Sequence, residues 1–266
     1  MTVRAKKRFG QHFLKDESTA RRIVDALEPG PHGRFVIEVG PGTGALTRHL
    51  LRRDDIRLLC IEVDREAADH LHHTFPELGD RLIVGDLLTM DLPALLHRAG
   101  ATPDEPFRII GNFPYNISTE IVFRVLEHRD RCPEVVGMFQ KEVADRLRAG
   151  PGSRTYGITC VLTRAWYDVE LLFHLGPEAF SPPPKVHSSV VRFTRNAVQR
   201  LPCDEALFRQ VVRTAFNQRR KTLHNALKPL AALAGNVPPH LAGKRAEQLD
   251  VADFVELARL ADRPSG

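Results

Sequence analysis

Residues 35–44 read Phe-Val-Ile-Glu-Val-Gly-Pro-Gly-Thr-Gly, and this stretch decides the fold. The run up to Gly40 is nearly all apolar and rich in β-branched residues, which is typical of a strand buried on both faces. Glycines at Gly40, Gly42 and Gly44 permit positive φ angles and let the backbone pass close to a ligand. A helix-period segment follows over residues 44–53. A buried strand, a glycine-rich turn and a helix together predict an open α/β sheet that holds a nucleotide-like ligand at the strand's C-terminal end.

Six more apolar runs of strand length follow, and helix-period segments separate most of them. The expected strands are residues 57–63, 81–84, 107–111, 135–139, 169–175 and 189–193, and the expected helices are residues 65–74, 117–128, 141–148 and 156–165. This alternation predicts a mostly parallel sheet covered on both faces. Only a Pro-rich loop joins the last two strands, whereas a parallel crossover normally contains a helix, so that pair should be antiparallel. The predicted fold class is α/β, with a seven-stranded Rossmann-like domain.

The strand pattern stops near residue 196, and the rest of the chain has helical periodicity. Helices are expected at residues 204–217, 219–232, 239–247 and 251–262, with prolines between them. We therefore predict two domains, an α/β domain over residues 1–195 and a small all-helical domain over residues 196–266.

The composition excludes several classes of protein. An apolar fraction of 42% and a charged fraction of 27% are those of an ordinary soluble globular protein rather than a disordered or membrane chain. No apolar run approaches the ~20 residues that span a bilayer. The basic N-terminus is not followed by the apolar stretch that a secretory signal requires. We expect a cytoplasmic protein with no membrane segment.

Cysteine and histidine usage gives no sign of a metal. The cysteines are scattered, with no Cys-x-x-Cys pair, and stand at Cys60, Cys132, Cys160 and Cys203. That spacing indicates neither a zinc site nor a disulfide framework. A polar helix face explains the cluster of Asp69, His70, His72 and His73 better than a metal site does.

Positive charge gathers at the two ends of the chain. The net charge is +5, and residues 1–8 carry four basic groups and no acid. Residues 196–266 carry 11 basic and 7 acidic groups, so the middle of the chain has a net charge of −3. Such ends suit a polyanion such as nucleic acid, although solvated lysine and arginine give the same pattern.

Acidic residues end the second and third expected strands, where a nucleotide ligand would lie. Glu62 follows Gly40 by 22 residues, close to the spacing at which an acid holds ribose hydroxyls. Asp86 is placed to accept a hydrogen bond from an adenine amine, with Leu87 packed nearby, although by itself a Gly-Asp pair after a strand is better explained as a helix-starting turn. Because Gly40-x-Gly42-x-x-Ala also fits the dinucleotide fingerprint, these features do not separate NAD from S-adenosylmethionine.

The discriminating motif is Asn112-Phe-Pro-Tyr115, which follows the fourth strand. The exocyclic nitrogen of adenine is a poor nucleophile because its lone pair is delocalised into the ring. Two acceptors, the side-chain carbonyl of Asn112 and the backbone carbonyl of Pro114, can grip its hydrogens and free that lone pair. Tyr115 offers a face on which an extruded base stacks. The motif predicts methylation of an aromatic amine, catalysed by positioning and electrostatics without a metal.

Several stretches beyond that motif carry a resemblance to a known family. The string Gly-Asn-Phe-Pro-Tyr-Asn-Ile-Ser over residues 111–118 resembles the signature of the ribosomal RNA adenine dimethyltransferases, which use S-adenosylmethionine. Residues 8–14, 138–144 and 180–188 agree with that family. Residues 215–227, Ala-Phe-Asn-Gln-Arg-Arg-Lys-Thr-Leu-His-Asn-Ala-Leu, look like the small-subunit branch. The resemblance covers nearly the whole chain.

The resemblance implies dimethylation of two adjacent adenines near the 3′ end of small-subunit rRNA, and a role in small-subunit biogenesis. The implied cofactor site comprises Gln11, His12, Leu14, Gly40, Gly42, Gly44, Glu62, Asp86, Leu87 and Asn112. The implied catalytic pocket comprises Asn112, Pro114, Tyr115 and Phe180. The family usually has Asn where this chain has His12 and Leu where it has Phe113.

The implied partner is rRNA in a pre-ribosomal 30S particle, bound by a monomer. Within the C-terminal motif we favour phosphate contact by Arg219, Arg220 and Lys221 over a merely solvated face. Three alternatives remain open at this point: an enzyme of the sister class that modifies large-subunit rRNA, a nicotinamide-dependent oxidoreductase, and a non-catalytic RNA-binding relative.

Overall fold

The computed structural model describes residues 3–29 and 32–262. Contacts divide the chain into two compact units, one of residues 1–144 with 169–195 and one of residues 145–168 with 196–266. The sequence pattern predicts a single division near residue 195. In the structure, residues 145–168 group with the C-terminal unit instead.

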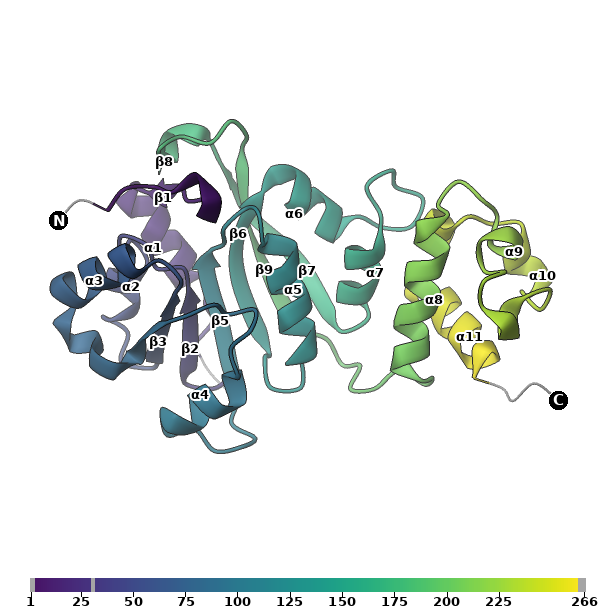
Figure 1. The fold of residues 1–266 in the computed structure, drawn as a ribbon, viewed down its shortest axis with the longest axis horizontal. Coiled ribbons are helices and arrows are strands. Elements are labelled where there is room, and N and C mark those ends of the chain that lie inside the picture. The colour runs from purple at the N-terminus through teal and green to yellow at the C-terminus, as the bar shows by residue number, and fades with distance from the viewer. Residues whose placement is uncertain (1–2, 30–31, 263–266) are drawn as a thin grey trace. The chain divides into compact units, whose positions relative to one another are not determined.

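A seven-stranded sheet forms the centre of the first unit (Figure 1). Its strands, in spatial order, are β4 (Leu82–Val84), β3 (Arg57–Glu62), β2 (Phe35–Val39), β5 (Phe107–Asn112), β6 (Glu134–Gln140), β9 (Ser188–Arg195) and β7 (Tyr167–Leu175). The pairs β4–β3, β3–β2, β2–β5 and β5–β6 are parallel. All seven strands therefore lie where the apolar runs predict them.

Strand β9 runs against its neighbours, as the Pro-rich connection predicts. It pairs antiparallel with β6 over the length of both strands. On its other side, His174 of β7 bonds to Ser189, and Glu170 of β7 bonds to Arg192. Residue numbers fall on one strand as they rise on the other, which is the pattern of an antiparallel pair.

Most expected helices are present with nearly the expected bounds. These are α3 (Arg65–Thr74), α5 (Ser118–Glu127), α6 (Lys141–Arg148), α7 (Ile158–Arg164), α8 (Glu205–Asn217) and α11 (Val251–Ala261). Two further helices, α1 (Glu17–Asp25) and α4 (Leu92–Arg98), were not predicted from the sequence. Asp16 and Asp91 cap these two helices through their side chains, and this is the local signal that would have located them.

Three predicted helices are wrong in length. In place of residues 44–53, α2 covers only Thr47–Leu50, because the preceding glycines hold positive φ angles that no helix contains. In place of residues 219–232 there is a single turn, α9 (Leu223–Ala226), and a 3₁₀ turn, η4 (Ala231–Leu233). Pro229 interrupts this segment because proline cannot donate to the preceding helical turn. Residues 239–247 form α10 (Pro239–Ala242) and the 3₁₀ turn η5 (Ala246–Gln248).

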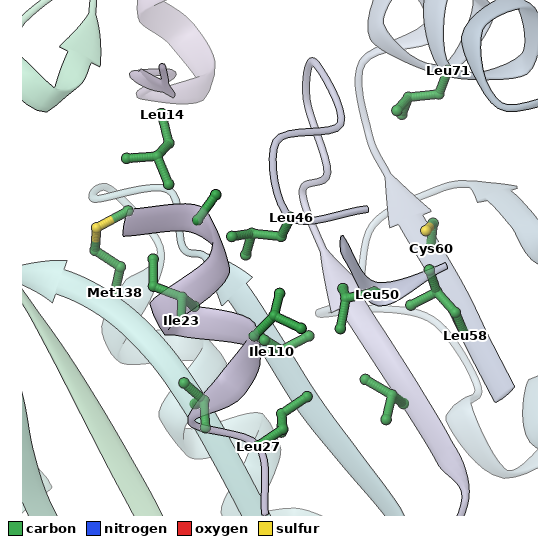
Figure 2. Close-up of a cluster of buried hydrophobic side chains, with 14 of the residues drawn as sticks. Leu14, Ile23, Leu27, Leu46, Leu50, Leu58, Cys60, Leu71, Ile110 and Met138 are labelled. Carbon is green, nitrogen blue, oxygen red and sulfur yellow. The ribbon is translucent and has the colours of Figure 1, made fainter. Parts of the chain in front are cut away.

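Apolar side chains cover both faces of the sheet. On one face, Ile23 of α1, Leu27 just after that helix, Leu50 of α2 and Leu71 of α3 belong to the buried cluster drawn in Figure 2, together with Ile110 of β5. On the other face, α5 packs against an aromatic group made of Phe113, Phe139 and Phe193. This two-sided burial explains why the strands read as nearly continuous apolar runs.

A two-stranded ribbon joins the N-terminal segment to the Pro-rich loop. Strand β1 (Phe13–Leu14), after the 3₁₀ turn η1 (Lys7–Phe9), pairs antiparallel with β8 (Phe180–Ser181). The other 3₁₀ turns of this unit are η2 (Pro76–Arg81) and η3 (Pro177–Ala179). The ribbon brings together residues that are about 170 positions apart in the sequence.

The second unit is held by helix packing around aromatic residues. Helices α8 and α11 contact each other along much of their length. Trp166 is fully buried and meets Phe208 of α8 edge to face, with ring centroids 6.0 Å apart. Tyr167, the next residue, is also buried, at 1% exposed. In the described part of the chain, no helix combines the length and apolarity needed to cross a membrane.

Candidate active site

A cavity opens at the C-terminal ends of β2, β3, β4 and β5. It encloses about 660 Å³, part of which is open to solvent. Its walls include eight residues of the predicted cofactor site: Gln11, His12, Gly40, Gly42, Glu62, Asp86, Leu87 and Asn112. Pro114 and Tyr115, predicted to hold the target base, line the same cavity. The topology therefore brings predicted site residues that are far apart in the sequence to one place, as expected for the edge of an open α/β sheet.

The glycine-rich turn forms the floor of the cavity. Gly40, Gly42 and Gly44 have φ angles of 64°, 59° and 82°, which explains why each is glycine. A side chain at Gly42 would come within 2.9 Å of the Phe13 ring, and one at Gly44 would collide with Phe75. Gly42 faces the cavity, whereas Gly44 does not line it and instead makes room for core packing.

Glu62 is a buried carboxylate held by two backbone donors. Its Oε2 accepts a hydrogen bond of 3.0 Å from the Gly42 N–H, and its Oε1 accepts one of 2.9 Å from the Asp64 N–H. Burial raises the pKa of Glu62, and these two hydrogen bonds act in the opposite direction. Each carboxylate oxygen keeps a further lone pair, so Glu62 remains able to accept hydrogen bonds from a ligand's hydroxyl groups.

The Asn112 side chain is fixed by its own amide group. Asn112 Nδ2 donates a hydrogen bond of 2.7 Å to the backbone carbonyl of His12. Because a carbonyl oxygen only accepts, this contact sets which way the amide faces. Within the described residues Asn112 Oδ1 accepts no hydrogen bond, so it is available to a ligand amine. The carbonyl of Pro114 accepts one hydrogen bond of 3.2 Å, from the Ile117 N–H, and keeps its second lone pair.

Tyr115 and His12 stack at the mouth of the cavity. Their ring centroids lie 5.3 Å apart with an interplanar angle of 29°. The Tyr115 hydroxyl is 2.5 Å from Ser188 Oγ, and His12 Nδ1 is 2.8 Å from the carbonyl oxygen of Pro182. Burial raises the pKa of Tyr115, so its hydroxyl stays protonated at neutral pH. The imidazole that replaces the family's usual Asn therefore packs on one face of the tyrosine ring.

Phe113, the second departure from the family pattern, is accommodated by glycine. Its ring is 1% exposed and meets Phe139 edge to face, with centroids 5.2 Å apart. A side chain at Gly111 or Gly137 would collide with the Phe113 ring. The larger side chain thus fills space beneath the motif and displaces neither acceptor.

Three predicted site residues do not line this cavity. Gly44 faces Phe75, as described above. Leu14 and Phe180 are paired in the β1–β8 ribbon and are 5% and 1% exposed, within the hydrophobic core. Asp86 lines the cavity, and its side chain also accepts a hydrogen bond of 2.9 Å from the Leu88 N–H, as in a turn that follows a strand.

The cavity is also lined by residues that were not predicted from the sequence, among them Phe9, Phe13, Val63 and Ile117. Val63 is 44% exposed, which is unusual for a large apolar residue in this chain. Its position directly after Glu62 is the signal that would have identified it, because an apolar residue at a strand end faces the ligand edge of the sheet.

In the second unit, the predicted RNA-binding residues divide into two kinds. Arg219 forms an ion pair of 2.7 Å with Glu247 and donates a hydrogen bond of 2.6 Å to the carbonyl of Arg154. Arg220 and Lys221 are exposed, and neither side chain makes a hydrogen bond or ion pair with the described residues. Arg219 therefore ties loops of this unit together, while its two neighbours reach solvent.

The described residues contain no group of three or more His, Cys, Asp or Glu placed to hold a metal ion. Asp69, His72 and His73 on α3 are exposed, as a polar helix face requires. The cysteines are free thiols, three of them buried and Cys203 partly exposed.

Comparison with known proteins gives the same family over nearly the whole length. The family model described as ribosomal RNA adenine dimethylase matches residues 2–261. A ribosomal RNA small subunit methyltransferase A from Cytophaga hutchinsonii is 49% identical over 258 residues, which cover 97% of each chain. The protein of the same name from Parabacteroides distasonis is 48% identical and covers 98% of this chain and 95% of its own length.

Solved structures share the fold. A dimethyladenosine transferase from Plasmodium falciparum matches with a TM-score of 0.73 and 25% identity, over 92% of this chain and 96% of that one. The 23S rRNA methyltransferase ErmE matches with a TM-score of 0.64 and 26% identity, over 92% of this chain and 99% of that one.

Proposed function

This chain belongs to the ribosomal RNA adenine dimethylase family, and from that premise we propose that it transfers methyl groups from S-adenosylmethionine to the N6 amines of adenines in small-subunit rRNA. The relatives that match at 48–49% identity are named for the small subunit, which supports this substrate over large-subunit rRNA. Family membership removes the nicotinamide-dependent oxidoreductase from consideration, and the intact Asn112–Tyr115 motif argues against a non-catalytic relative.

The side chains and backbone groups that line the cavity fit the chemistry of the proposed cofactor. Glu62, Val63 and Leu87 line the same cavity, and we propose that Glu62 binds the ribose hydroxyls while Val63 and Leu87 contact the nucleobase. Side chains at Gly40 and Gly42 would narrow the space beside the turn, so the glycines keep it open. When bound, the cofactor supplies an electrophilic methyl group on a sulfonium.

The chain's own residues prepare the amine for that methyl group. Asn112 Oδ1 and the Pro114 carbonyl, both with free lone pairs, accept the two hydrogens of the adenine amine and draw its nitrogen toward tetrahedral geometry. The contact of Asn112 Nδ2 with His12 holds this acceptor in place before the substrate arrives, so little reorganisation is needed during reaction. Tyr115 supplies a stacking face for a base withdrawn from the RNA.

The finer features of the substrate follow from family membership. We propose that two adjacent adenines near the 3′ end of 16S rRNA are dimethylated, within a pre-ribosomal 30S particle in the cytoplasm, and that the enzyme acts as a monomer. The exposed cations Arg220 and Lys221 of the helical unit are placed to contact phosphates.

The single observation that carries this proposal is the free acceptor Oδ1 of Asn112 inside the cavity that Glu62 lines. The test is incubation of the protein with methyl-labelled S-adenosylmethionine and unmethylated small- or large-subunit particles, followed by mass spectrometry of digested rRNA. We expect N6,N6-dimethyladenine in small-subunit rRNA with wild type and not with Asn112→Ala. Label confined to large-subunit rRNA would move the protein to the sister class.

A further inference from the structure

The N-terminal segment forms one wall of the cofactor cavity and touches both of its ends. Residues 9–13 line the cavity. At one end, the His12 carbonyl holds the Asn112 amide, and Gly10 lies so close to Asn116 that a side chain at Gly10 would collide with it. At the other end the segment meets residues 64–66, directly after Glu62. The segment therefore connects the predicted ribose site to the predicted catalytic turn.

The contact with residues 64–66 is an ion-pair network centred on Lys6. Lys6 Nζ lies 2.6 Å from Asp64 Oδ1 and 2.9 Å from Glu66 Oε2. Gln11 joins the same network, because its Oε1 accepts from the Lys6 N–H at 2.9 Å and its Nε2 donates to Asp64 Oδ2 at 3.3 Å. The Arg4 N–H adds a hydrogen bond of 3.3 Å to Glu66.

Asp64 gives this network its strength. Its side chain is only 3% exposed, and a buried carboxylate without a partner is costly. Burial alone raises the pKa of Asp64, but hydrogen bonds from Lys6 and Gln11 outweigh burial and lower it. Hydrogen bonding to Asp64 and Glu66 raises the pKa of Lys6, so the pair stays ionised at neutral pH. Lys6 supplies the positive charge that this buried carboxylate needs.

Asp64 also connects the network to the cofactor site. Its backbone N–H donates to Glu62 Oε1, and its side chain caps α3 by accepting from the Glu66 N–H at 3.1 Å. Asp64 thus both orients Glu62, the carboxylate predicted to bind ribose, and anchors the N-terminal wall of the cavity.

We infer that Lys6 is a positioning residue for the cofactor, which fastens residues 4–12 across the cavity through Asp64 and Glu66. The inference rests on the cavity being the cofactor site proposed above. Lys6 then pairs with the protein's own acids, whereas the charge pattern of the sequence left nucleic acid and solvent as alternatives for the basic N-terminus. Loss of Lys6 should release the wall, speed cofactor dissociation and loosen the support of Asn112.

The first test needs no cofactor. Amide hydrogen exchange is measured on wild type, Lys6→Ala and Lys6→Arg, with Lys15→Ala as the matched control, because Lys15 is an exposed cation just beyond residues 4–12. We expect amides of residues 6–12 to exchange about tenfold faster in Lys6→Ala, with near-wild-type rates in the other two variants. Equal rates in Lys6→Ala and wild type would overturn the fastening role, whatever the enzyme's substrate.

The second test measures dissociation of S-adenosylmethionine by stopped flow. We expect about tenfold faster dissociation from Lys6→Ala, rescue by Lys6→Arg, and a double variant Lys6→Ala/Asp64→Asn no faster than Lys6→Ala, since asparagine keeps the α3 cap. Dissociation unchanged in Lys6→Ala, with only the salt dependence of RNA binding altered, would overturn the inference and return Lys6 to RNA. Failure of wild type to bind S-adenosylmethionine would instead count against the proposed cofactor, and the exchange experiment would still decide the fastening role.

Discussion

The side-chain amide of Asn112 donates a hydrogen bond to the backbone carbonyl of His12, across 2.7 Å in space and 100 residues of sequence. The contact involves the His12 backbone, so it is independent of which side chain occupies position 12. It therefore survives the replacement of the family's usual Asn by His. It leaves Oδ1 as the acceptor that faces the cavity, which is the orientation that amine methylation requires.

Removal of the Asn112 side chain should slow the chemical step. The contact to the amine strengthens as the nitrogen becomes tetrahedral, so Asn112→Ala should lower kcat more than it raises KM for RNA. One positioned acceptor is worth about 2.7–4 kcal/mol, or about a hundred- to a thousand-fold in rate. Single-turnover kinetics with saturating RNA and cofactor measures this step. A rate within about threefold of wild type would show that the acceptor mechanism is wrong.

Tyr115→Ala is the comparison for that experiment. A stacking platform stabilises the extruded base before and during methyl transfer. Its loss should therefore raise the KM for RNA by the factor that corresponds to the ~1–3 kcal/mol of one stacked base. Tyr115→Phe keeps the ring and loses only the hydroxyl contact with Ser188, so it should retain most of the affinity. If Tyr115→Ala lowered only kcat, the ring would have a role other than stacking.

Glu62→Ala should weaken cofactor binding. The substitution removes a charge-assisted acceptor of ribose hydroxyls, worth about 1.5–3 kcal/mol. It also leaves the Gly42 and Asp64 N–H groups without their acceptor, so the glycine turn loses its anchor. Calorimetric titration with S-adenosylmethionine gives the change, and a parallel thermal melt of the cofactor-free protein separates it from general instability. Unchanged affinity would assign Glu62 to the turn alone.

Arg220 and Lys221 should account for part of the salt dependence of RNA binding. Each phosphate contact contributes about 0.7–0.9 to the slope of log affinity against log salt concentration. The variant Arg220→Ala/Lys221→Ala should reduce the steepness of that slope by up to the contribution of about two such contacts, and it should leave the melting temperature of the protein unchanged. Arg219→Ala should instead lower the melting temperature, because Arg219 pairs with Glu247 and holds the Arg154 carbonyl. An unaltered slope in the double variant would mean that the two cations are only solvated.

Glu38 should give the fold a pH dependence. This carboxyl group is fully buried beneath the glycine turn, where Thr47 Oγ1 donates a hydrogen bond of 2.7 Å to it. Burial raises its pKa to about 7, above its unfolded value. The native state therefore holds a proton that the unfolded state has released, and this contribution to stability is lost as pH rises toward 7.

The check is urea unfolding of wild type and Glu38→Gln between pH 5 and 8. The stability of wild type relative to Glu38→Gln should fall by about 1.4 kcal/mol per pH unit up to about pH 7, and then level off. A difference that stays constant across this range would show that Glu38 has an ordinary pKa.

The sequence by itself determined the features that a local pattern encodes. Apolar runs located all seven strands of the central sheet, because a strand that is buried on both faces needs apolar side chains at successive positions. The glycines at positions 40, 42 and 44 indicated a turn with positive φ, and the Asn112–Tyr115 motif indicated acceptors for an amine. Carboxyl ends of parallel strands meet at one edge, so the predicted site residues could be expected to converge there.

Only the tertiary structure decided what depends on partners distant in sequence. No local pattern shows that Lys6 pairs with Asp64, that Arg219 pairs with Glu247, or that Leu14 and Phe180 bury each other in a ribbon. The local sequence around a lysine or arginine does not distinguish a side chain that contacts RNA from one that pairs with a buried carboxylate. The two cases differ only in which acids the fold brings within hydrogen-bonding distance, and that is set by packing across the whole chain.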